Sequence, residues 1–151
     1  MDEERDRDLA QEQSLVDRFI LNRIDSVPHL EALLLIWRSR TEARKQSATT
    51  GAEEAAGPVW NADRVARRLW ITTEVARSVL RDLERNQLIS AIAKGDERYC
   101  YQSEPERDRA IEAVETAYAR DMIRISNMIH SKGSAAVRDF ARAFRLKKDP
   151  E

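Results

Sequence analysis

The chain has 151 residues, of which 42% are hydrophobic and 35% charged, a balance typical of a soluble, helix-rich protein with one compact domain and appendages. No apolar run approaches the roughly 20 residues that a membrane-spanning helix needs. The acidic, polar start does not have the pattern of a secretory signal peptide. The single cysteine, Cys100, excludes an internal disulfide framework and favours a cytoplasmic protein.

Charge is distributed unevenly along the chain, although the formal net charge is only −1. Residues 1–57 hold 8 basic and 12 acidic side chains, residues 58–102 hold 8 and 6, and residues 103–151 hold 10 and 9. The first part is therefore acidic, whereas the middle and the end are mildly basic. This distribution indicates only a weak electrostatic preference for a nucleic acid.

Residues 1–13 are polar throughout, and we expect them to form a disordered lead-in. From Leu15 to Ile24, apolar residues recur at spacings of three and four, which predicts a helix. A second helix is predicted over about 28–40, with Pro28 in its first turn, where a missing N–H costs nothing.

Residues 41–57 have no apolar stripe and contain Gly51 and a pair of threonines. A flexible linker is favoured over a frayed continuation of the preceding helix, because glycine and threonine are weaker helix formers than alanine.

Residues 58–102 predict a short helix, a tight turn, a longer helix and a hairpin, in that order. Asn61 is suited to cap the first helix, and Thr72 to cap the second, which we expect over about 73–86. Asn86 is a candidate for a left-handed residue at the end of the second helix. Residues 94–97 predict the hairpin turn.

The last third of the chain predicts two more helices. Ser103 followed by Glu106 has the spacing of a capping box, and it opens a long helix over about 104–131. Gly133 is suited to end that helix, and Ser134 to cap the last one.

The stretch WNADRVARRLWITTEVARSVLRDLERNQLIS resembles the helix-turn-helix of bacterial winged-helix transcription regulators. The matching residues are the small Ala66, the turn residue Ile71, the cap Thr72, and the apolar positions Val79, Leu80, Leu83, Leu88 and Ile89. The segments FILNRIDSVPHLEALLLIWRSR and IHSKGSAAVRDFARAFRLKKD are also similar to short bacterial proteins of this architecture.

This resemblance implies a winged helix-turn-helix fold, mainly α with a small β-hairpin wing. We expect the winged-helix domain over residues 14–102 and a two-helix C-terminal extension over 103–151. The resemblance implies a DNA-binding transcriptional regulator. Winged helices also serve as protein-interaction modules, so an adaptor that does not bind DNA is the alternative.

The candidate contacts to double-stranded DNA lie on the two motif helices and the wing. Side chains on one face of the second helix would enter the major groove, where arginine donates a bidentate pair to guanine: Thr73, Glu74, Arg77, Ser78, Arg81 and Arg85. Cations on the first helix and the wing would contact phosphates: Arg64, Arg68, Lys94 and Arg98. The alternative for each of these side chains is an ordinary solvent-exposed position that makes no contact with DNA.

The long C-terminal helix carries a broad apolar stripe at near-heptad spacing, which predicts a homodimer interface continued by two phenylalanines in the last helix. Its candidate residues are Ile111, Val114, Tyr118, Ile125, Met128, Phe140 and Phe144. Packing against the helix at 28–40 is the alternative. The last helix is also basic, but docking on the protein's own core or on a dimer partner is favoured over membrane-surface binding.

No arrangement of residues predicts catalysis, a metal or a cofactor. His29 and His130 are far apart, and no Cys/His ligand spacing occurs. The four glycines form no phosphate-binding loop, and there is no nucleophile elbow. We therefore expect a non-enzymatic protein.

Overall fold

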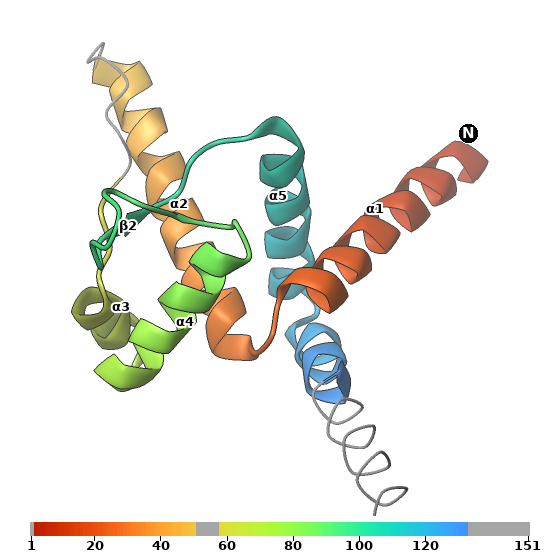
Figure 1. Ribbon diagram of the computed structural model, residues 1–151. Coiled ribbons are helices and arrows are strands. Elements are labelled where there is room, and N and C mark those ends of the chain that lie inside the picture. Colours follow the sequence, from red (N-terminus) through yellow and green to blue (C-terminus); the bar gives the residue numbers. More distant parts are fainter. Residues whose placement is uncertain (1, 51–57, 133–151) are drawn as a thin grey trace, which may run out of the picture. The chain divides into compact units, whose positions relative to one another are not determined.

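A computed structural model describes residues 2–50 and 58–132, which are mainly helical with a small two-stranded antiparallel hairpin (Figure 1). The elements in chain order are α1 (Asp2–Arg23), α2 (Val27–Thr50), α3 (Ala62–Leu69), α4 (Thr73–Arg85), β1 (Ser90–Ala91), β2 (Tyr99–Cys100) and α5 (Pro105–Arg120). A further helix covers 122–132.

The chain divides into two compact units. Among the described residues, the central unit comprises 28–50 and 58–111, and the terminal unit comprises 2–27 together with 112–132. This division differs from the expected boundaries at 14–102 and 103–151, because the first helix belongs with the C-terminal half of the chain.

In the terminal unit, α1 begins at Asp2, where a disordered lead-in over 1–13 was expected. Acidic residues occupy its first turn, where the N-terminal end of the helix dipole favours negative charge. The segment up to Ser14 is exposed, and burial begins with Val16. The charges of the first turn therefore stabilise the exposed beginning of α1, and apolar packing stabilises the helix from Val16 onward.

Two polar contacts hold the elements of the terminal unit together. Arg124 Nη2 lies 3.1 Å from Asp17 Oδ1 on α1. Lys132 Nζ donates to the backbone oxygen of Ile24, just past the end of α1, at 2.9 Å. Cations near a helix C-terminus are favourable, so this contact stabilises the end of α1.

The long helix expected over 104–131 is interrupted at Asp121. The Asp121 carboxylate accepts a hydrogen bond from the backbone N–H of Arg124 at 3.2 Å. This is the geometry of a helix N-cap, so the following helix starts anew at residue 122. Asp121 also interrupts the apolar seam in the sequence, but the seam resumes at Ile125, so a continuous helix was expected.

In the central unit, α2 supplies much of the buried apolar surface, with Leu30, Leu33, Leu34 and Ile36 at most 1% exposed. The helix continues to Thr50, so the expected linker is wrong over residues 41–50. Hydrogen bonds such as that from Thr41 Oγ1 to the Trp37 oxygen, 3.0 Å, satisfy polar side chains within the helix. The rest of that linker, 51–57, lies outside the described residues.

α3 and α4 pack against each other, and both begin with the expected caps. Asn61 Oδ1 accepts from the Arg64 N–H at 2.9 Å, and Thr72 Oγ1 accepts from the Val75 N–H at 3.2 Å. The helical spacing of the apolar residues on α4 predicts both Val75 and Ala76 on the buried face; Ala76 is buried, but Val75 is 44% exposed and does not belong to that face.

Two residues that are not glycine adopt left-handed backbone geometry at the ends of these helices. Trp70, at the end of α3, has φ 58° and ψ 41°, and Gln87, after α4, has φ 61°. Asn86, the expected left-handed residue, instead has φ −81°. Left-handed geometry costs a residue with a Cβ roughly 1–2 kcal/mol, so both positions store strain.

The hairpin pairs β1 with β2, with Ser90 opposite Cys100 and Ala91 opposite Tyr99. Its turn closes one residue earlier than expected, since the Asp96 N–H donates to the Ala93 oxygen at 2.9 Å. Gly95 has φ 81° there, which glycine adopts without steric cost.

Trp60 extends the sheet on the other side of β2. Its backbone N–H and oxygen both pair with Tyr99, each at 2.7 Å. Its indole is 1% exposed and donates from Nε1 to Ser39 Oγ on α2 at 3.0 Å. This residue therefore connects the start of α3, the hairpin and α2.

The junction between the hairpin and α5 differs from the expected capping box. Ser103 does not cap the helix; its hydroxyl donates to the Asp108 carboxylate, which also accepts from Tyr101. Glu104 Oε2 caps the helix by accepting from the Arg107 N–H at 3.3 Å. Burial, reinforced by the hydrogen bond to Asp108, raises the pKa of Tyr101 above its ordinary value.

Candidate nucleic-acid interface

The outward face of α4 carries the side chains that the sequence predicted for the major groove. Glu74, Ser78, Arg81 and Arg85 are exposed, and Thr73 and Arg77 are half-buried. The opposite face is formed by the buried Ala76, Val79, Leu80 and Leu83. This separation of faces follows from the helical spacing of the apolar residues.

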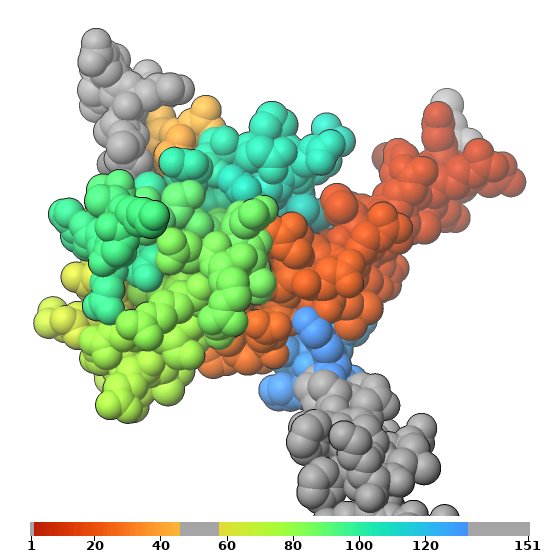
Figure 2. Space-filling model, in the orientation of Figure 1, coloured from red at the N-terminus to blue at the C-terminus, as the bar shows by residue number. Residues whose placement is uncertain are grey.

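The hairpin lies beside this face (Figure 2) and directs an acidic side chain at its arginines. Glu97 Oε2 lies 3.6 Å from Arg77 Nε, and Glu97 Oε1 lies 3.2 Å from Arg81 Nη2. One carboxylate thus partly neutralises both of the arginines predicted to contact bases.

A second ion pair lies within the hairpin turn, where Arg98 Nη2 is 2.6 Å from Asp96 Oδ2. The hydrogen bond from Arg98 holds the pKa of Asp96 below its ordinary value. The same contact raises the pKa of Arg98. Arg98 is therefore engaged inside the turn and is less suited to a phosphate than its sequence position suggests.

The predicted phosphate contacts on α3 differ in their surroundings. Arg64 stacks on the Trp60 ring, with its guanidinium carbon 4.1 Å from the ring centre, and donates from Nη1 to the Val59 oxygen at 2.9 Å. Arg68 is exposed. Lys94 at the hairpin tip is also exposed. Within the described part of the chain, neither Arg68 nor Lys94 forms an ion pair.

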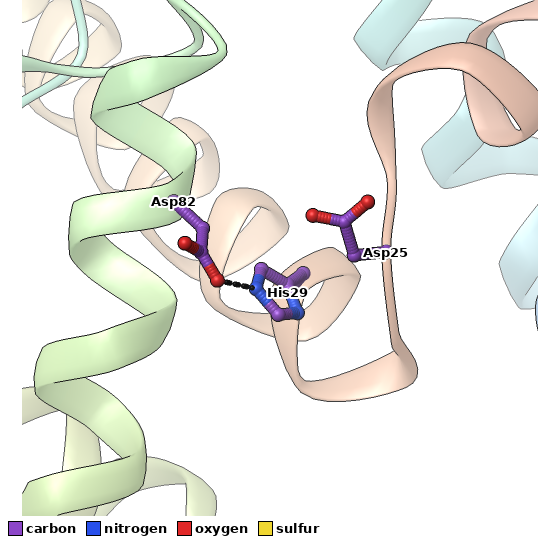
Figure 3. Close-up of side chains that lie close together, drawn as sticks. All are labelled: Asp25, His29 and Asp82. Atoms are coloured by element: carbon purple, nitrogen blue, oxygen red, sulfur yellow. Dashed lines mark hydrogen bonds and ion pairs between the residues drawn. The ribbon is translucent and has the colours of Figure 1, made fainter. Parts of the chain in front are cut away.

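A histidine of α2 contacts α4 at Asp82, the residue that follows Arg81. His29 Nε2 lies 2.8 Å from Asp82 Oδ2, as Figure 3 shows. The other oxygen of Asp82 lies 3.0 Å from Arg85 Nη2. Arg85 is therefore directed toward Asp82, which leaves Arg77 and Arg81 as the arginines nearest the hairpin.

The residues predicted for dimerisation are mostly buried within the chain. Ile111, Val114, Tyr118 and Ile125 are at most 7% exposed, and Met128 is half-buried. Phe140 and Phe144 lie outside the described residues. The exposed apolar side chains nearby are instead Met122 at 55% and Ile123 at 75%.

Three residues of this surface were missed in the sequence. Arg67 is exposed next to Arg68 and forms no ion pair among residues 2–50 and 58–132; the adjacent arginines were the available signal. Trp70 was not singled out as a contact residue, and its side chain is 93% exposed. Glu97 was assigned only to the hairpin turn, because nothing in the sequence shows which arginine it faces.

Comparison of the chain with protein-family models, with curated proteins and with solved structures found no match. Among the helices of the described residues, none combines the length and the apolar character needed to cross a membrane.

Proposed function

We propose that the central unit is a winged helix-turn-helix domain and that the protein is a cytoplasmic, DNA-binding transcriptional regulator acting as a homodimer. The order of α3, a tight turn, α4 and a hairpin supports this proposal, as does the packing of α3 against α4. The pairing of Trp60 with Tyr99 adds a third extended segment beside the hairpin.

The observation that carries the proposal is the pair of arginines on α4 next to the hairpin. The side chains of Arg77 and Arg81 are 40% and 59% exposed, on the face opposite the buried one. Arginine donates two parallel hydrogen bonds to guanine in the major groove, which a helix of this size can enter. Arg68 and Lys94 flank the face and suit phosphate oxygens.

The ion pairs of Glu97 with Arg77 and Arg81 make the binding of DNA by these arginines moderately less favourable. Base edges of the DNA must replace Glu97 as the partner of Arg77 and Arg81, and exposed ion pairs of this kind are each worth about 0.2–1 kcal/mol. That cost is smaller than the gain from several phosphate contacts at low salt. DNA binding by this face is therefore expected to be salt-sensitive and of modest strength.

The test is fluorescence anisotropy with random-sequence and selected duplexes at low and moderate salt. Arg77→Ala or Arg81→Ala is expected to cost about 1–3 kcal/mol at the preferred site and to relax base preference. Lys94→Ala is expected to weaken binding to all sequences alike and to reduce the salt dependence by about one unit of slope.

Arg109→Ala is the matched control, since Arg109 is an exposed arginine on α5 outside the motif. It removes the same charge and is expected to leave affinity almost unchanged. If wild-type protein binds no duplex even at low salt, the DNA-binding proposal is wrong.

The alternative is a winged-helix module that binds a protein. The ion pairs of Glu97 with both arginines and the net charge of −1 favour it. A protein partner would bind without the steep salt dependence that counterion release gives to DNA binding.

A further inference from the structure

Trp70 combines left-handed backbone geometry with an exposed indole. The geometry closes α3, since the backbone N–H of Ile71 donates to the Ala66 oxygen at 3.1 Å, but the helix end does not require an exposed ring. Trp70 ends α3 in left-handed geometry, which bulky residues avoid and glycine adopts freely. It also leaves its indole 93% exposed, whereas Trp60 is 1% exposed. Tryptophan is enriched at interfaces, so this exposed ring indicates a position that contacts a partner.

The surroundings of Trp70 indicate the chemistry of that partner. Arg67 and Arg68, in the last turn of α3, are exposed and form no ion pair within the part of the chain that the structure describes. On the other side, Trp70 leads into Thr72, the cap of the 13-residue helix α4, whose N-terminus carries positive partial charge. Such a surface favours a partner rich in anionic groups.

The position of Trp70 also matches the expected path of a DNA backbone. When a recognition helix enters the major groove, its first residues face the bases, and the preceding segment lies near the sugars and phosphates. The indole offers an apolar face to a sugar and one N–H donor to a phosphate oxygen.

We propose that Trp70 is a DNA-contact residue whose indole packs against the sugar-phosphate backbone at the edge of the groove that α4 enters. This inference rests on the proposed DNA-binding function and adds a residue to it. In this assignment, the left-handed turn that ends α3 also projects the ring toward the nucleic acid.

The test compares two substitutions that relieve the same backbone strain. Trp70→Gly is expected to raise the melting temperature by several degrees and to weaken duplex binding about five- to tenfold. Gln87→Gly is the matched control, because Gln87 is exposed and also has positive φ, but at the opposite end of α4. It is expected to raise the melting temperature without changing affinity.

Acrylamide quenching of tryptophan fluorescence gives a second readout. Trp60 is buried and Trp37 half-buried, so the most accessible indole in the described residues is that of Trp70. Bound duplex is expected to reduce the quenching of wild-type protein and to change the quenching of Trp70→Gly little.

The outcomes separate the two proposals. If wild-type protein binds duplex, Arg77→Ala weakens binding and Trp70→Gly does not, the inference is wrong and the proposed function stands. If wild-type protein binds no duplex, both are wrong, and the exposed indole belongs to a protein contact instead.

Discussion

Asp108 joins the end of the hairpin to α5 by accepting hydrogen bonds from Ser103 and Tyr101. Burial alone would raise the pKa of Asp108, but these two hydrogen bonds, together with a backbone hydrogen bond and the nearby charge of Arg107, leave the pKa below its ordinary value of 3.8. The ionised carboxylate therefore stabilises the folded state. Such a contribution is complete above the unfolded-state pKa and is lost as the pH falls through the folded-state pKa.

Asp108→Asn is expected to lower the free energy of unfolding by about 1–2 kcal/mol at pH 7, because the amide replaces an ionised acceptor of two hydrogen bonds. The difference from wild type should narrow as the pH falls below about 4. Urea unfolding at several pH values measures both effects. Glu106→Gln, an exposed position on the same helix, serves as the control. An equal loss at all pH values would contradict the assignment.

Glu97 is the residue whose removal tests the electrostatics of the candidate interface. Glu97→Gln releases Arg77 and Arg81 and removes one negative charge that faces the nucleic acid. Duplex affinity is expected to rise about two- to fivefold at low salt, in line with the small energy of exposed ion pairs. Glu84→Gln is the matched control, because Glu84 is an exposed acidic residue of α4 for which no salt bridge is recorded in the described part of the chain. An unchanged affinity for Glu97→Gln would show that Glu97 does not compete with DNA.

At the scale of elements, the caps of α3 and α4 are local and testable. Thr72→Ala removes the acceptor for the Val75 N–H and is expected to cost about 1 kcal/mol of stability. Thr73→Ala is the control: it also removes a hydroxyl from the first turn, but not the capping one. Urea unfolding should separate the two variants, and equal losses would argue against a capping role.

The elements also explain which helical predictions held and which did not. Asn61 and Thr72 were predicted as caps and are confirmed, since a cap needs only a side-chain acceptor two or three residues before an N–H. The interruption at Asp121 follows the same rule. It was not predicted, because the apolar stripe resumes after Asp121 and one polar residue in such a stripe is compatible with a continuous helix.

At the scale of the whole molecule, the homodimer remains a prediction. Sedimentation at micromolar concentration is expected to show twice the chain mass of 17.4 kDa. Because Ile111, Val114 and Ile125 are 0% exposed, a dimer contact in this region must use exposed apolar side chains such as Ile123. Ile123→Lys is then expected to shift the equilibrium toward monomer.

A monomer in the wild-type protein would contradict the homodimer. Ile125→Lys is the informative comparison, since that side chain is buried and its replacement should lower stability rather than dimer affinity alone. In a dimeric regulator, the two copies of α4 would lie about 34 Å apart, one turn of DNA, on a pseudo-palindromic site.

The sequence by itself determined the order and caps of the central elements. The spacing of Val79, Leu80 and Leu83 defines a buried face of α4 because a helix repeats every 3.6 residues, and that face is buried. It also placed Arg77 and Arg81 on the opposite face. The caps and the two faces of α4 depend on residues within about one helical turn of each other, so the spacing of residues in the sequence is enough to predict them.

Only the tertiary structure decided what those side chains meet. The pairing of Glu97 with Arg77 and Arg81 joins residues 16 to 20 positions apart, and the hydrogen bond of His29 to Asp82 spans 53. Such contacts depend on how separate elements pack, which periodicity does not encode. The same reason explains the 93% exposure of Trp70, which depends on how the elements of residues 2–50 and 58–132 pack and not on its position in the turn.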